Sequence, residues 1–78
     1  MKVDLTRMKM GEEGVIAEIN GGHKLEKRLQ SLGVNLGAKI KKISAQMLRG
    51  PISIQVGNTK AAIGYGMAKK IWIEKDQL

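Results

Sequence analysis

Cysteine is absent from this chain of 78 residues. Its absence excludes disulfide scaffolds, metal sites built on thiolates and cysteine nucleophiles. A protein without disulfides suits a reducing compartment, so we expect a cytoplasmic location. No apolar segment follows Met1, and the uncharged stretch from Ala61 to Ala68 is much shorter than the ~20 residues that cross a bilayer. We therefore expect neither a signal peptide nor insertion into a membrane.

Aromatic residues and histidine are also scarce. Phenylalanine does not occur, the two aromatic residues are Tyr65 and Trp72, and His23 is the single histidine. Proteins that hold single-stranded nucleic acid stack bases on aromatic side chains, so this composition gives little support to specific nucleic-acid binding. One histidine, no cysteine and no GxSxG motif leave few groups for acid–base or nucleophilic catalysis. We expect that the protein is not an enzyme.

Glycine and positive charge are what the chain has in excess. Ten glycines are about twice the usual share, which indicates many tight turns and hence short strands. Fourteen Lys and Arg against seven Asp and Glu give a net charge of +7. Residues 21–49 hold most of this excess. A basic segment of this kind attracts nucleic acid, acidic lipid or an acidic protein surface, and it is equally typical of a solvated face.

The hydrophobic pattern predicts one domain, residues 1–78, made of short strands. Residues 3–10 read as a lead-in, and β-branched or alternating segments predict strands at 15–19, 39–45, 52–56, 59–63 and 71–74. In the first strand, one face is shared by Val15, Ala17 and Ile19. In the second, Ile40 and Ile43 are three residues apart, which predicts a β-bulge or a strong twist.

One helix is predicted, at residues 24–32. Its apolar stripe consists of Leu25, Leu29 and Leu32. Its basic face consists of Lys24, Lys27 and Arg28. Gly33 supplies the expected C-terminal stop. A helix this short is marginal alone, so its leucine stripe must pack against the sheet.

Together these elements predict a mainly β fold. Five short strands, with one short helix inserted after the first, are typical of a small antiparallel barrel of the SH3-like type. A helical turn at residues 64–68, just before the last strand, fits the same barrel. Closing the sheet removes exposed strand edges, which otherwise invite aggregation.

The order of these elements and their residues resemble the FeoA family over residues 5–74. The matching pieces are Gly11-Glu12-x-Gly14, Gly21-Gly22, Leu25-x-x-x-Leu29-x-x-Leu32-Gly33, Pro51-Ile52-x-Ile54 and Ala68-x-x-Ile71-x-Ile73. The basic helix followed by Leu-Gly is the most specific part. Members of this family are small cytoplasmic partners of the FeoB ferrous iron transporter, and they share the SH3-like domain of iron-dependent regulators.

The resemblance implies a cytoplasmic accessory or regulatory protein of ferrous iron uptake that binds FeoB by protein–protein contact. Two alternatives stay open on the sequence alone. One is an SH3-like module that binds nucleic acid, which the charge of +7 motivates. The other is a metal-sensing module akin to the C-terminal domain of iron-dependent regulators.

His23 and Glu26 are the candidate metal ligands, since they lie three residues apart near the start of the helix. A site needs three or more ligands, and the sequence contains no HExxH or paired-cysteine spacing. An exposed residue at the helix start explains His23 more simply. We expect that no cofactor is required and that any transition-metal binding is weak.

The partner-binding residues we predict come from the helix and two loops. The basic helix face, Lys24, Lys27 and Arg28, would govern encounter, with Lys39, Lys41 and Lys42 extending the basic surface. Leu48 and Tyr65 would be the apolar anchors, together with Met47. Capping the end of the barrel is an equally good explanation for Leu48 and Tyr65.

Overall fold

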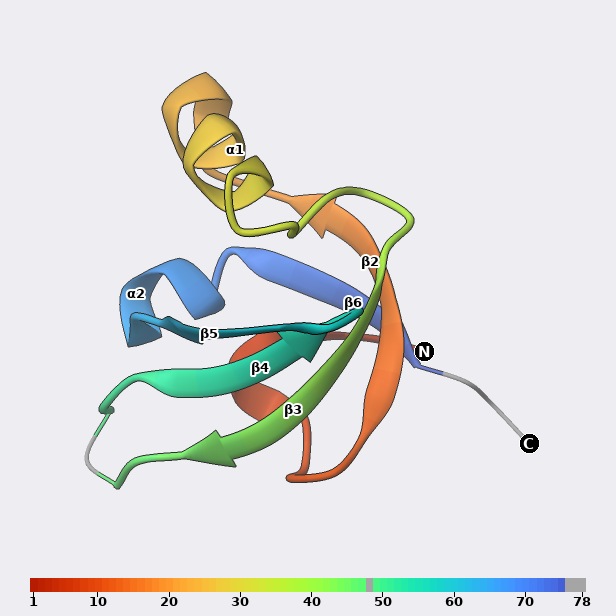
Figure 1. Ribbon diagram of the computed structural model, residues 1–78, viewed down its shortest axis with the longest axis vertical. Helices are drawn as coiled ribbons and strands as arrows, with labels where there is room; N and C mark the ends of the chain where they lie inside the picture. Colours follow the sequence, from red (N-terminus) through yellow and green to blue (C-terminus); the bar gives the residue numbers. More distant parts are fainter. Residues whose placement is uncertain (48, 76–78) are drawn as a thin grey trace.

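The strands of the chain pair into one antiparallel sheet (Figure 1). The computed structural model describes residues 1–47 and 49–75. In chain order the elements are β1 (Lys2–Asp4), the 3₁₀ helix η1 (Leu5–Arg7), β2 (Glu13–Ile19), α1 (Gly22–Gln30), β3 (Lys39–Ala45), β4 (Ile52–Val56), β5 (Thr59–Ile63), α2 (Tyr65–Ala68) and β6 (Ile71–Lys75). The mainly β class and the helix after the first predicted strand are confirmed.

The sheet contains one strand more than the sequence pattern predicted. Its order is β1-β6-β2-β3-β4-β5 within the described residues. The additional strand, β1, lies in the segment expected to be a lead-in, and it pairs with β6 through Val3 and Ile73. Three residues are too few to show an alternating pattern, so only the pairing with β6 defines this strand.

The predicted bulge in β3 is confirmed. The register of β3 against β4 shifts between Lys42 and Ser44, which leaves Ile43 as the extra residue. A second shift, between Ile16 and Glu18 of β2, was not predicted. Because of it, the expectation that Val15, Ala17 and Ile19 share one face is wrong. Val15 is exposed, whereas Ile19 packs against the core.

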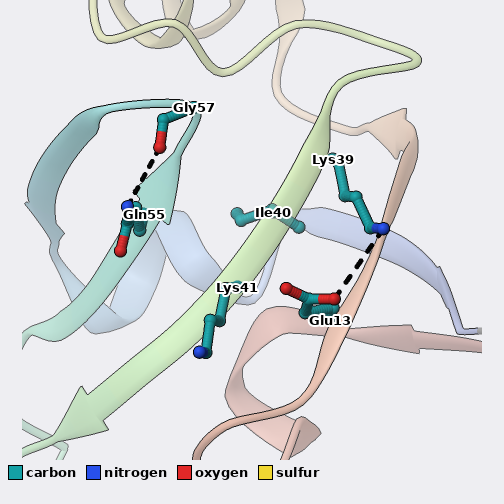
Figure 2. Close-up of a pocket in the computed structure, with 6 residues that line it drawn as sticks. All are labelled: Glu13, Lys39, Ile40, Lys41, Gln55 and Gly57. Carbon is teal, nitrogen blue, oxygen red and sulfur yellow. Dashed lines mark hydrogen bonds and ion pairs between the residues drawn. The ribbon is translucent and has the colours of Figure 1, made fainter.

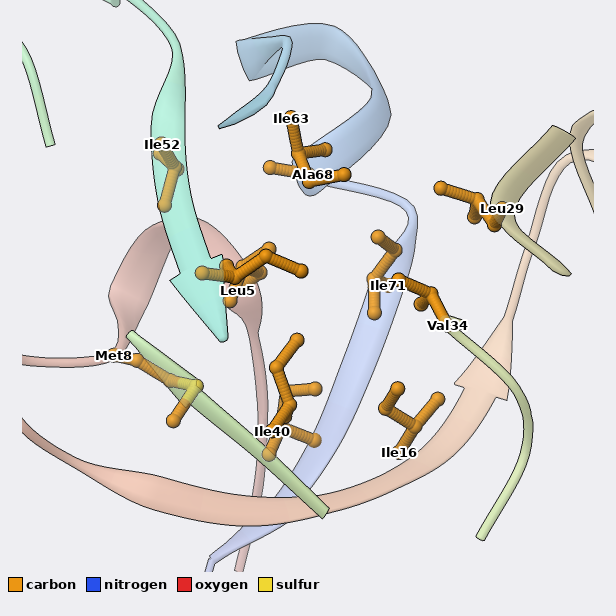
Figure 3. Close-up of a cluster of buried hydrophobic side chains, with 12 residues drawn as sticks. Leu5, Met8, Ile16, Leu29, Val34, Ile40, Ile52, Ile63, Ala68 and Ile71 are labelled. Carbon is orange, nitrogen blue, oxygen red and sulfur yellow. The ribbon is translucent and has the colours of Figure 1, made fainter. Parts of the chain in front are cut away.

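The core is aliphatic and lies between the curved sheet and the short helices (Figure 3). The fully or almost fully buried hydrophobic residues are Leu5, Met8, Ile16, Leu29, Val34, Ile40, Ile52, Ile54, Ile63, Ala68, Ile71 and Ile73. Isoleucine fills most of these positions because β-branched side chains pack well on a pleated surface. The closing strand contributes Ile71 and Ile73, as predicted.

α1 begins and ends two residues earlier than predicted, and Gly33 closes its C-terminal end as predicted. Gly33 has a φ of +86°, a conformation that glycine adopts without strain. Its amide donates to the Gln30 carbonyl at 2.9 Å, and the Val34 amide donates to the Leu29 carbonyl at 2.9 Å. This is a Schellman ending, with buried Val34 as its apolar contact. It fixes the helix with Leu29 pointing toward Val34 and Ile71 (Figure 3).

Lys42 is buried, so the prediction that it extends the basic surface is wrong. Lys42 lies two residues after buried Ile40 and before the bulge, so it faces inward by simple alternation, and its residue is 4% exposed. Its Nζ donates to the carbonyl of Met8 at 2.7 Å and to those of Leu5 and Thr6 at 3.2 Å each. These carbonyls belong to the 3₁₀ helix η1 and its C-cap residue Met8, so Lys42 ties the N-terminal segment to the centre of the sheet. Burial lowers the pKa of Lys42, and the charges of Asp4 and Glu12 partly oppose that shift.

Glu12 makes the folded state sensitive to acid. Its carboxylate accepts the Lys9 backbone N–H at 2.6 Å and pairs with the Lys75 ammonium at 2.9 Å. Both lower the pKa of Glu12 below its ordinary 4.5, the backbone bond more than the ion pair. The unfolded chain therefore takes up the proton first on acidification. The stabilisation from ionised Glu12 is complete above pH 4.5, and it is lost as the pH falls through the lower pKa that Glu12 has in the folded state.

We predict that Glu12→Gln flattens the acid limb of the stability curve. Chemical denaturation at a series of pH values should show that the free energy of unfolding of the variant falls less steeply below pH 4.5 than that of wild type. Lys75→Met removes the ion pair and leaves the hydrogen bond from the Lys9 amide, so its slope should lie between those of wild type and Glu12→Gln. Identical slopes for all three proteins would contradict this role for Glu12.

Candidate partner-binding surface

The basic face of α1 is exposed, because the leucine stripe of the helix faces the core. Leu29 is fully buried, and Leu25 and Leu32 pack against the core while remaining half-buried. The side chains on the opposite face, Lys24, Lys27 and Arg28, are all exposed. The structure thus places the three predicted basic residues on one accessible helix surface.

Lys24 and Arg28 also line a groove between α1 and α2. The groove has a volume of about 410 Å³, and it is completed by Gly21, Leu25 and Met67. Most of its lining surface is apolar. Figure 1 shows α1 and α2 next to each other at one end of the sheet. Lys27 does not line this groove, although it lies on the same exposed face.

Gly21 has a local packing reason for its place beside the groove. A Cβ atom at this position would lie 2.3 Å from Cδ2 of Leu25, closer than any real contact. A glycine here therefore leaves room for the Leu25 side chain to lie across the connection from β2. The sequence pattern identified Leu25 as part of the core stripe, and the structure shows that it also reaches the groove.

The three residues predicted as apolar anchors in the loops, Met47, Leu48 and Tyr65, differ in how exposed they are and in whether the structure describes them. Tyr65 begins α2 and is half-buried. Met47 is 86% exposed, and Leu48 lies outside the described residues. Met67, which the sequence analysis did not select, is the α2 residue that lines the groove. No periodic pattern could have connected it with α1, because the two segments are far apart in the chain and meet only in the folded protein.

The remaining lysines of the predicted basic surface lie on the outer face of the sheet (Figure 2). Lys39 and Lys41 are exposed on β3 and line a hollow of about 310 Å³ with Gln55 of β4. Lys39 faces Glu13 of β2 at 3.8 Å, and Gln55 donates to the Gly57 carbonyl at 3.0 Å. Since Glu13 offsets part of the charge here, this face is less strongly cationic than the exposed face of α1.

The two candidate metal ligands lie near each other, but they lack further partners. Nδ1 of His23 is 3.8 Å from Oε2 of Glu26, and the His23 side chain is 92% exposed. Among the residues that the structure describes, no group of three or more His, Cys, Asp or Glu could hold a metal ion. The geometry at this point is that of a surface pair at the start of a helix.

None of the helices in the described part of the chain has the length and apolar character needed to span a membrane.

Comparison with known proteins gives a consistent match along the whole fold. The model of the FeoA domain family matches residues 3–75. A protein of Methanocaldococcus jannaschii named "Putative Fe(2+) transport protein A" is 41% identical over 66 residues, which are 85% of this chain and 78% of that protein.

Solved structures agree with this match. A crystal structure of an iron uptake regulatory protein, FeoA, has a TM-score of 0.88 and 37% identity, and the match covers 97% of this chain and 99% of that one. The FeoA of Stenotrophomonas maltophilia, crystallised with zinc and described as a procaryotic SH3 domain protein, has a TM-score of 0.78 and 21% identity over 92% of this chain and 89% of that one. The predicted SH3-like class is confirmed.

Proposed function

This chain belongs to the FeoA family, and from that membership we propose that it is a non-enzymatic accessory protein of ferrous iron uptake that binds the FeoB transporter on its cytoplasmic side. The observation that supports contact with a partner is the exposed basic face of α1. It is held rigidly, because the stripe beneath it packs into the core and the helix ends in a Schellman motif. Such a surface is suited to steering an acidic partner.

Specific nucleic-acid binding is not part of this proposal. The two aromatic residues, Tyr65 and Trp72, are both half-buried. The described residues therefore offer no broad exposed aromatic surface on which bases could stack. Charge alone supports weak binding that salt removes.

We predict that reversing the basic face of α1 slows association with FeoB. The variant carries glutamate at Lys24, Lys27 and Arg28. Its association rate with immobilised full-length FeoB should fall by about tenfold or more at low salt and should lose most of its dependence on ionic strength. Because all three side chains are exposed, the melting temperature should change little.

The control must carry the same change in net charge. Glutamate at Lys9, Lys41 and Lys60, which are exposed outside α1, provides it. If both triple variants slow association equally, net charge and not the α1 face governs the encounter. If wild type itself does not bind FeoB, the proposed function is wrong.

We also propose that folding requires no metal ion. Treatment with a strong chelator should leave the far-ultraviolet circular dichroism and the melting temperature unchanged, because an exposed pair such as His23 and Glu26 is too small a ligand set to hold a structural metal. A drop in melting temperature that added zinc or ferrous iron reverses, and that His23→Ala abolishes, would contradict this.

A further inference from the structure

The groove between α1 and α2 has the composition of an anchor site. Leu25 and Met67 form its apolar part, and both also pack against the core, so they are held in place from below. In protein interfaces, most of the binding free energy comes from a few bulky side chains that enter such pockets. Methionine adapts its shape to different ligands because its side chain is flexible and polarisable.

The charge around the groove is of one sign. Its charged lining residues are Lys24 and Arg28, which are one helical turn apart, and none of the carboxylates in residues 1–47 and 49–75 lines it. Glu26 lines a different hollow, of about 270 Å³, together with Gln30 and the loop at Leu36. The groove beside Lys24 and Arg28 is therefore cationic, whereas the hollow that Glu26 lines carries a negative charge.

We propose that this groove binds a short acidic segment of the partner that inserts one bulky apolar side chain between Leu25 and Met67. Carboxylates on either side of the inserted residue would pair with Lys24 and Arg28, and the planar guanidinium of Arg28 can hold a carboxylate through two parallel hydrogen bonds. This inference rests on the proposed function for the identity of the partner, and it adds the chemistry of the docking segment and the position of the anchor.

The first test uses matched single substitutions and full-length FeoB. Met67→Gln keeps the length of the side chain and makes the groove polar, so the complex should dissociate about tenfold faster or more. Arg28→Ala should weaken binding by a similar factor. Lys60→Ala removes the same charge at an exposed position on β5, outside both the groove and the basic face of α1, and should change the affinity by less than about twofold.

The second test needs no transporter. The probe is an acetylated and amidated pentapeptide with a central leucine between glutamates, added to the isotopically labelled full chain at about 1 mM. The amide signals of residues 21–28 and 65–68 should shift. A peptide with a central alanine should cause smaller shifts, and one with lysines in place of glutamates should cause none.

The two tests separate this inference from the proposed function. If FeoB binds wild type, Met67→Gln and Arg28→Ala equally well, the groove is not the anchor, and the inference is overturned while the proposed function stands. If FeoB does not bind but the acidic peptide shifts the groove signals, the inference stands with another partner. Peptide shifts confined to other parts of the chain, or equal shifts with the lysine peptide, overturn it.

Discussion

Leu29→Ala should lower the free energy of unfolding by about 2–5 kcal/mol, the usual cost of truncating a buried leucine. Leu29 is the residue of α1 that is fully buried, at 0% exposure. It points toward Val34 and Ile71 (Figure 3), so its loss opens a cavity between the helix and β6. A domain of this size has a total stability of about 5–15 kcal/mol, so the variant will be partly unfolded at moderate temperature.

Urea denaturation followed by circular dichroism measures this effect. Leu36→Ala is the matched control, because the same atoms are removed from a side chain that is 63% exposed. Its free energy of unfolding should change by less than about 0.5 kcal/mol. Equal losses in the two variants would mean that α1 does not rest on the core through Leu29.

The result bears on function as well as on stability. α1 carries Lys24 and Arg28, and the packing of Leu29 is what places these side chains beside α2. Leu29→Ala should therefore weaken binding to FeoB at temperatures where the β-sheet is still folded, because an isolated helix of this length is marginal in water.

Lys42→Met should lower the free energy of unfolding by about 2–4 kcal/mol, since the Met8 carbonyl loses the Lys42 donor and the Leu5 carbonyl keeps only the Met8 amide. Methionine has nearly the same shape, so the change removes the ammonium group without opening a large cavity. The carbonyls of Leu5 and Met8 would then be buried next to a thioether that cannot donate a hydrogen bond. Lys41→Met, at the neighbouring exposed position, is the control and should change stability by less than about 0.5 kcal/mol.

The pH dependence of stability, compared between wild type and Lys42→Met, is an independent test of the role of Lys42. Burial lowers the pKa of Lys42 in the folded state below the ordinary 10.5 of the unfolded chain. As pH rises toward 10.5, the folded chain releases this proton before the unfolded chain does, so wild type gains stability relative to Lys42→Met. The difference between their unfolding free energies should widen over that range. If it narrows, the three carbonyls hold the ammonium more strongly than burial disfavours it.

Local periodicity was enough to predict most of the fold. The alternation of Ile52, Ile54 and Val56 located β4, and that of Ile71 and Ile73 located β6. The three-residue spacing of Ile40 and Ile43 indicated the bulge that is seen in β3. The stripe that contains Leu29 indicated which side of α1 is buried, and therefore that Lys24, Lys27 and Arg28 are exposed. Each of these features repeats within a few residues, so it can be recognised without knowing what the segment packs against.

Local periodicity failed where a feature depends on distant pairing. β1 is a strand only because β6 lies beside it, and the bulge at Ala17 is visible only in the register of β2 against β6. Either Lys42 or Ile43 fits the core position of β3 that follows Ile40: Lys42 by simple alternation, Ile43 if a bulge precedes it. Which one enters the core depends on the position of the bulge, because a shift of one residue moves every following side chain to the other face.

The sequence by itself determined the mainly β class, the position of α1, its basic face and the resemblance to the FeoA family. The tertiary structure alone decided that Lys42 is an internal donor to the N-terminal turn and that Met67 joins Leu25, Lys24 and Arg28 in one groove. The physical reason is that secondary structure follows from interactions between near neighbours in the chain, whereas a buried hydrogen bond or a groove needs side chains that only chain folding brings together.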